Sequence, residues 1–210
     1  MRYLLTVLLS LATVLPILAQ SNSFGSLQFG LGASFGLYNT EFNESYPPTN
    51  YARTNRDNAV AVSFPLEVHL GLVPFMSLGL YLQPGSYLDT SATRSNSMFI
   101  GGLSPRFYIV NGDRFNWFAG LEAGLANLVI KERPFAGGTY QYTFGGGHFR
   151  IASGFNLYFG KVVGMQMQMK YAVYNMPLWD LEPNFSDYTA RLKVDGLEAQ
   201  LGLVFKLGGD

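Results

Sequence analysis

Apolar and polar residues alternate along most of the chain after residue 25. In the clearest segment, Ser26–Tyr38, every second residue is apolar and most of the others are Gly, Ser or Gln. Strict alternation predicts a β-strand with one face in apolar surroundings. The same pattern defines seven further segments, which are Val60–Leu72, Phe75–Leu82, Met98–Val110, Phe115–Leu128, His148–Gly160, Val162–Tyr174 and Val194–Leu207. The apolar faces hold almost no charge.

The connections between these segments alternate between short and long. Tight turns are expected at Val73-Pro74, Asn111–Arg114 and Gly160-Lys161, and long polar loops at Asn39–Ala59, Gln83–Ser97, Val129–Gly147 and Asn175–Lys193. A short–long rhythm over an even number of strands is typical of outer-membrane barrels, with short turns in the periplasm and long loops outside. We therefore predict an all-β fold, an eight-stranded antiparallel up-and-down transmembrane β-barrel with both termini periplasmic.

A soluble β-sandwich or calyx also shows alternation and tight turns. Three features favour the membrane barrel instead. The polar faces are built from Gly, Ser and Gln rather than the charged residues of a solvated surface. Most segments exceed the five or six residues typical of soluble strands. Aromatic residues also gather near the segment ends, where an interfacial girdle belongs.

Two prolines fit this pattern badly. Pro65 and Pro105 fall inside predicted strands, where each removes a backbone donor from the hydrogen-bond ladder. A closed barrel has no edge strand to accommodate them. We therefore predict a bulge or a local break at each proline.

Composition narrows the class of protein further. The chain has 210 residues, no cysteine, 13% charged residues and a formal net charge of zero. The scarcity of charge with 15% aromatic residues excludes a disordered chain, and the lack of a basic excess argues against nucleic acid as a partner. Disulfide scaffolds and zinc–thiolate sites are excluded by the cysteine count. Residues 1–19 are predicted to be a signal peptide, because a positive start is followed by an apolar stretch. Residues 20–210 are predicted to form the barrel domain.

Charged residues on the polar faces point into the predicted lumen. They are Glu67, Arg106, Glu122, Arg150, Lys170, Glu198 and Lys206. An eight-stranded barrel is only wide enough for side chains to fill it, so each charge there needs a partner or costs several kcal/mol. Strand heights predict a buried network of Glu122, Arg150, Lys170 and Glu198 that plugs the lumen. Glu67 and Arg106 are also assigned to this lumen charge network. An ion path is the alternative, and the narrow lumen argues against it.

Candidate catalytic groups are sparse. A hydrolase of the lipid-modifying kind needs a serine nucleophile beside a histidine base, with a carboxylate behind it. The chain has only His69 and His148, at opposite ends of the predicted barrel, and Ser153 is out of phase with His148. We expect no catalytic residue, and His148 is interpreted as a hydrogen-bonding residue at the mouth of the lumen. Two separated histidines make a poor metal site, and no cofactor is expected.

The long loops are the best candidate interaction surface. They carry aromatic residues beside arginines, the residue types that anchor protein interfaces. The candidate interface residues are Tyr46, Tyr51, Arg53, Trp179, Phe185 and Tyr188. Loop aromatics could equally pack over the barrel mouth or lie among lipid headgroups, and the sequence leaves both open.

With eight strands, an Ala-Gln signal junction and a polar, Gly-rich interior, the chain resembles the small barrels grouped with OmpA and OmpX. More narrowly, it looks like the "outer membrane protein beta-barrel" family of Bacteroidota, with its PorT-like members. The resemblance implies an outer-membrane protein of a Gram-negative bacterium, in contact with lipid and with envelope protein partners through its loops or wall. We predict a non-enzymatic structural or accessory subunit. A small-solute pore and a lipid-modifying enzyme are the alternatives.

Overall fold

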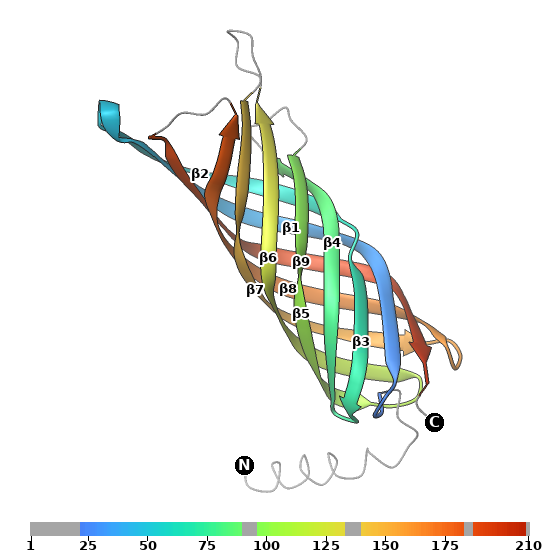
Figure 1. The fold of residues 1–210 in the computed structure, drawn as a ribbon. Helices are drawn as coiled ribbons and strands as arrows, with labels where there is room; N and C mark the ends of the chain where they lie inside the picture. The colour runs from blue at the N-terminus through green and yellow to red at the C-terminus, as the bar shows by residue number, and fades with distance from the viewer. Residues whose placement is uncertain (1–21, 90–95, 133–139, 183–186, 209–210) are drawn as a thin grey trace, which may run out of the picture.

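The computed structural model describes residues 22–89, 96–132, 140–182 and 187–208, which form a closed antiparallel β-barrel (Figure 1). Its strands are β1 (Leu27–Tyr46), β2 (Tyr51–Ser63), β3 (Leu66–Val73), β4 (Met76–Asp89), β5 (Asn96–Asn111), β6 (Phe115–Glu132), β7 (Tyr140–Tyr158), β8 (Val163–Glu182) and β9 (Thr189–Leu207). A short 3-10 turn, η2 (Pro47–Thr49), joins β1 to β2. Pairing of β1 with β9 closes the ring. The predicted signal peptide lies outside the described residues.

The nine strands occupy eight positions around the ring. Both β2 and β3 pair with β1 on one side and β4 on the other, so they are two halves of one interrupted strand. The interruption falls at Phe64 and Pro65, which confirms the break predicted at that proline. The flanking strands bridge it, because Gly32 N donates to Pro65 O and Phe64 N donates to Pro84 O. The predicted eight-stranded antiparallel barrel is thus the observed fold.

At the second proline the expectation was only partly right. Strand β5 is continuous through Pro105, which pairs with Leu78 of β4. Pairing with β6 lapses at Ser104 and Pro105, yet Leu103↔Ala123 and Arg106↔Gly120 keep one register. No bulge is therefore needed at the proline, since a missing N–H interrupts only one side of the ladder. The register shift lies farther on, between Tyr108 and Val110.

A wide belt of exposed apolar side chains surrounds the barrel. On β9 it runs from Leu197 to Leu207, with every second side chain facing outward. Eleven residues of a strand tilted about 40° span about 25 Å along the barrel axis, the height of the apolar band of an outer-membrane barrel. We call this surface the apolar belt. No described residues form a helix long and apolar enough to cross a membrane.

The strands continue well past the belt, so the four predicted long loops were wrong over much of their length. For example, β1 extends to Tyr46 and β2 starts at Tyr51, within the predicted loop Asn39–Ala59. The reason is an inversion of polarity. On β9, Arg191, Lys193 and Asp195 point outward, whereas Ala190, Leu192 and Val194 point inward. Alternation persists beyond the belt with its apolar face turned inside, as in a soluble barrel. We call this region, the strands beyond the belt at the β1–β2 end, the rim.

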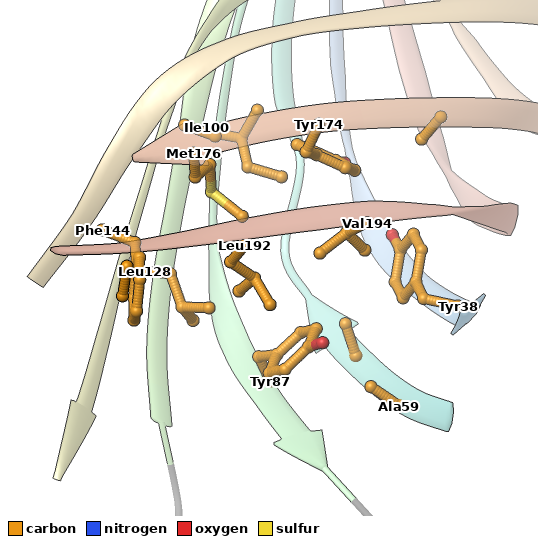
Figure 2. Close-up of a cluster of buried hydrophobic side chains, with 14 of the residues drawn as sticks. Tyr38, Ala59, Tyr87, Ile100, Leu128, Phe144, Tyr174, Met176, Leu192 and Val194 are labelled. Carbon is orange, nitrogen blue, oxygen red and sulfur yellow. The ribbon is translucent and has the colours of Figure 1, made fainter. Parts of the chain in front are cut away.

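The inward apolar residues of the rim meet in a core. They come from eight strands and are Tyr38, Ala59, Ala61, Tyr81, Tyr87, Ile100, Ala126, Leu128, Phe144, Ala172, Tyr174, Met176, Ala190, Leu192 and Val194. Figure 2 shows most of these side chains converging inside the barrel. An enclosed cavity between Tyr38, Tyr87 and Leu128 measures about 10 Å³, room for about one water. This core, the apolar layer, closes the rim end of the lumen.

The opposite end, the floor, holds both ends of the described chain (Figure 1). Asn22 is fully buried there. Its side-chain amide donates to Val73 O at 2.8 Å and to Pro74 O at 3.3 Å, and its backbone N donates to Asn111 Oδ1 at 2.9 Å. In return, Asn111 Nδ2 donates to Asn22 O and Pro74 O. The segment 22–26 thus ties the β3–β4 turn to the end of β5.

Candidate functional site

Six buried charged residues form one continuous chain across the lumen. In order they are Arg106, Glu67, Lys170, Glu122, Arg150 and Glu198, and each comes from a different strand. Cations and carboxylates alternate along the chain without exception. We call this set the lumen charge chain. Its net charge is zero.

The separations of these groups are those of ion pairs. Lys170 Nζ lies 3.5 Å from Glu67 Oε1 and 2.9 Å from Glu122 Oε1. Arg150 reaches Glu122 Oε2 at 2.7 Å and Glu198 Oε2 at 3.2 Å. At the floor side, Arg106 contacts Glu67. The six residues assigned to the lumen charge network therefore lie together, with Glu67 and Arg106 at one end of the chain. Lys206 lies apart, half-buried near the floor.

Uncharged polar side chains donate further hydrogen bonds to Glu198 and Glu67, the carboxylates nearest the two ends of the lumen charge chain. Glu198 accepts hydrogen bonds from Tyr38 at 2.6 Å, from Tyr174 at 2.8 Å and from Gln83 at 3.2 Å. Gln168 and Gln200 donate to Glu67. Buried ions are tolerated when their remaining lone pairs are satisfied in this way.

Aromatic rings cover the two arginines of the chain. The Arg106 guanidinium carbon lies 4.3 Å from the centre of the Phe118 ring, and that of Arg150 lies 4.6 Å from the Tyr81 ring. Such cation–π contacts stabilise a charge removed from water.

The two histidines lie inside the barrel rather than at its mouth. His148 is buried, contacts the Tyr81 hydroxyl and stacks on Tyr174 with ring centres 5.5 Å apart. His69 lies near the floor, with Nε2 3.7 Å from Glu67 Oε2. Ser153 faces outward and accepts a hydrogen bond from Trp117 Nε1. His148 and Ser153 thus lie on opposite faces of β7. Within the described ranges, no three His, Asp or Glu residues are placed to hold a metal ion.

The rim gathers several of the residues expected in a loop interface. Glu44 is central, since Tyr51 Oη donates to Glu44 Oε1 and Tyr188 Oη donates to Glu44 Oε2, both at 2.8 Å. Arg53 is the ladder partner of Glu44, and Tyr46 ends β1 beside Tyr51. Glu44, Tyr46, Tyr51 and Arg53 belong to the β1–β2 hairpin, which stands out from the barrel in Figure 1, whereas Tyr188 directly precedes β9. Phe185 lies outside the described residues.

Trp179 is separate from that group. It sits at a register shift between β7 and β8, faces outward and is 61% exposed. Its ring lies over Gly145, where an added Cβ would come within 2.4 Å of ring atoms. Trp179 therefore lies flat on the outer wall of the barrel, against the backbone of β7 at Gly145.

Charge at the rim is shared among neighbours. Glu41 lies between Arg56, at 3.0 Å, and Lys193, at 3.2 Å. Hydrogen bonds from Asn43, Arg56 and Lys193 lower the pKa of Glu41 to about 2. Burial and the hydrogen bond to Glu44 raise the pKa of the Tyr188 hydroxyl above its usual value. Both groups therefore keep one protonation state at ordinary pH.

The chain is similar to known proteins in its structure and not in its sequence. No protein-family model matches the chain, and no curated protein sequence matches it. The outer membrane protein OprG from Pseudomonas aeruginosa superposes with a TM-score of 0.59 at 10% identity, covering 90% of this chain and 99% of OprG. The fold is that of a small outer-membrane β-barrel.

Two other solved structures agree with this fold. The outer membrane protein AlkL gives a TM-score of 0.56 at 10% identity, over 91% of this chain and 94% of AlkL. The outer membrane protease OmpT from Escherichia coli gives 0.50 at 10% identity, over 87% of this chain and 97% of OmpT. OmpT is a protease by name, whereas the names of OprG and AlkL state no activity, so the shared barrel does not select a role.

Proposed function

We propose that this chain is an integral outer-membrane protein with a closed lumen, a non-enzymatic structural or accessory component that presents its rim outside the cell. The lumen charge chain carries the proposal. Six side chains from six strands neutralise one another across the barrel, and the apolar layer lies above them. A path for solutes would have to break both layers.

The belt and the rim support the proposed placement. Apolar side chains cover the barrel wall over the height of a bilayer core, and polar ones replace them at the rim. In outer-membrane barrels the longer connections face outward, so the floor with both chain ends would face the periplasm. Because the chain has no cysteine, single cysteines can report the orientation. Thr54→Cys at the rim should react with a membrane-impermeant maleimide on intact cells, and Lys161→Cys at the floor should not.

A non-catalytic role is supported by the positions of the nucleophile and base types. His148 is buried in the lumen, and Ser153 faces the belt from the other side of β7. An accessory role is supported by Tyr46, Tyr51 and Arg53 of the β1–β2 hairpin, and by Tyr188, whose hydroxyl donates to Glu44 of the same hairpin. The resemblance to PorT-like proteins makes a secretion assembly the first partner to consider.

Isolation of the native species tests the accessory role. A tag after Asp210 allows extraction from outer membranes in mild detergent, followed by measurement of the size and composition of the particle. Stoichiometric envelope partners, lost in a Tyr51→Ala/Arg53→Ala variant, would support the proposal. A lone monomer would contradict the accessory role and leave the closed barrel as a purely structural component.

A further inference from the structure

The rim wall contains a notch between β8 and β9. These strands pair only as far as Pro177 and Arg191. Beyond that point β8 continues beside β7 to Glu182, whereas β9 continues beside β1 to Thr189. The opening between them has a volume of about 560 Å³, within the range of ligand pockets. Its lining includes Ser45, Pro177, Tyr188, Thr189, Arg191 and Lys193.

The notch carries uncompensated positive charge. Arg191 has no ion-pair partner among the described residues. Lys193 contacts Glu41, but that carboxylate is also shared with Arg56. The acidic group of the notch, Glu44, has both oxygens occupied by tyrosine hydroxyls. These hydrogen bonds leave the charge of Glu44 in place, so the charged residues of the lining, Arg191, Lys193 and Glu44, carry a net charge of +1, which favours an anion.

The remaining lining matches a saccharide. Ser45 and Thr189 offer hydroxyl groups, Tyr188 offers an aromatic ring, and Pro177 and Leu178 provide an apolar wall. Hydroxyl and aromatic groups suit a sugar ring, while guanidinium and ammonium groups suit a phosphate.

The height of the notch above the apolar belt indicates where such a ligand would come from. Lys193 lies four residues beyond Leu197, the last apolar outward residue of β9. Four residues of a tilted strand rise about 10 Å above the apolar belt. The phospholipid headgroup zone extends only about 5 to 8 Å beyond the hydrocarbon core, so Lys193 lies just above this zone, at a height that a larger saccharide headgroup reaches. Arg191 lies farther out on the same face.

We propose that the notch binds the phosphorylated saccharide headgroup of a glycolipid in the outer leaflet. Arg191 and Lys193 contact the phosphate, and Ser45 and Thr189 contact sugar hydroxyls. This inference rests on the proposed outward orientation of the rim, and it is independent of any protein partner.

The test compares lipid retention by matched variants in nanodiscs. The native chain is reconstituted in phosphatidylcholine with and without lipopolysaccharide, and the lipopolysaccharide that remains after exchange into detergent is quantified. The double variant Arg191→Gln/Lys193→Gln removes both cations. Arg114→Gln/Lys161→Gln changes the net charge equally at the exposed floor turns and serves as the control. Ser45→Trp fills the notch and keeps its charges.

We expect the notch double variant to weaken retention on the order of tenfold or more, as loss of charge-assisted hydrogen bonds implies. Ser45→Trp should weaken it similarly, and the floor variant should match the native chain. Equal retention by the native chain and the notch variant would overturn the proposal. So would loss in the notch and floor variants alike, because that result indicates non-specific attraction.

A soluble probe separates the two sources of phosphate. Glucosamine 6-phosphate should compete only weakly, because it lacks the membrane anchor that holds the headgroup at the notch. Tight binding of this probe, with no retention of lipopolysaccharide, would reassign the notch to a free sugar phosphate and overturn the lipid assignment. Maleimide labelling of Thr54→Cys reports separately whether the rim faces outward, so failure of the proposed orientation is distinguishable.

Discussion

Glu122 is the carboxylate on which the middle of the lumen charge chain depends. It lies 2.7 Å from Arg150 and 2.9 Å from Lys170. Glu122→Gln leaves two buried cations with one fewer counter-charge, and removal of one partner from a buried pair costs about 3 to 5 kcal/mol. We expect the free energy of unfolding, measured by urea titration in lipid vesicles, to fall by about 3 kcal/mol.

Two variants serve as references for this prediction. Glu182→Gln removes an exposed carboxylate at the rim and should change the free energy of unfolding little. Glu122→Gln/Lys170→Met removes one charge of each sign and should destabilise less than the sum of its single variants. Additive losses would show that Glu122 and Lys170 do not act as a pair.

At the residue scale, the sequence identified the lumen charges but not their order. All six fall on inward positions of alternating segments, so their direction followed from period two alone. Their heights depend on strand tilt and stagger, which local sequence does not determine. Glu67 and Lys170 were both assigned to the network, but the contact between them was not predicted. Tyr38 and Tyr174 were missed as partners of Glu198 because neither carries a charge, although both lie in phase with the lumen.

Among the elements, the floor segment offers a direct test of what holds the short turns together. Asn111 exchanges three hydrogen bonds with Asn22 and Pro74. Each contributes about 1 kcal/mol, so Asn111→Ala should lower the free energy of unfolding by about 2 to 3 kcal/mol. It should also expose residues 22–26 to protease. Asn55→Ala, at an exposed position of β2, is the control, and resistance of residues 22–26 in Asn111→Ala would contradict this role.

The irregularity between β7 and β8 gives a second prediction at this scale. An added Cβ at Gly145 would lie 2.4 Å from Trp179 ring atoms, whereas one at Gly147 would have no neighbour closer than 4.0 Å. Gly145→Ala should therefore displace the Trp179 ring, shift its fluorescence emission and cost about 1 kcal/mol. Gly147→Ala should leave the spectrum unchanged. A Trp117→Phe background isolates the Trp179 signal, and identical spectra of the two variants would show that the ring does not rest on Gly145.

The elements also show why strand lengths could not be read from the sequence. The belt portions were found because apolar residues occupy one constant face. Beyond Leu197 on β9, the apolar residues Val194, Leu192 and Ala190 move to the opposite face. A search for one apolar face ends at that inversion, although the alternation itself continues. The same residues form the apolar layer. This core was therefore not predicted, for the same reason that the strand ends were not.

In the closed lumen that we propose, the whole molecule combines two seals of different chemistry. The lumen charge chain lies within the belt, and the apolar layer lies in the rim. Neutral pairing leaves the first seal without a net attraction for ions, and the second excludes water by packing. Each seal is made by side chains from most of the strands, so closure depends on the complete ring rather than on one loop.

A lumen closed by two seals should conduct no ions across a planar bilayer. The native chain should show no stepwise conductance, while a wide porin measured in the same membrane reports that insertion and recording work. Arg150→Ala opens space in the charge chain but leaves Leu128, Leu192 and Tyr87 packed above it, so this variant should be silent too. Steps in Arg150→Ala alone would show that the apolar layer does not seal. Steps in the native chain would favour a small-solute pore over a closed platform.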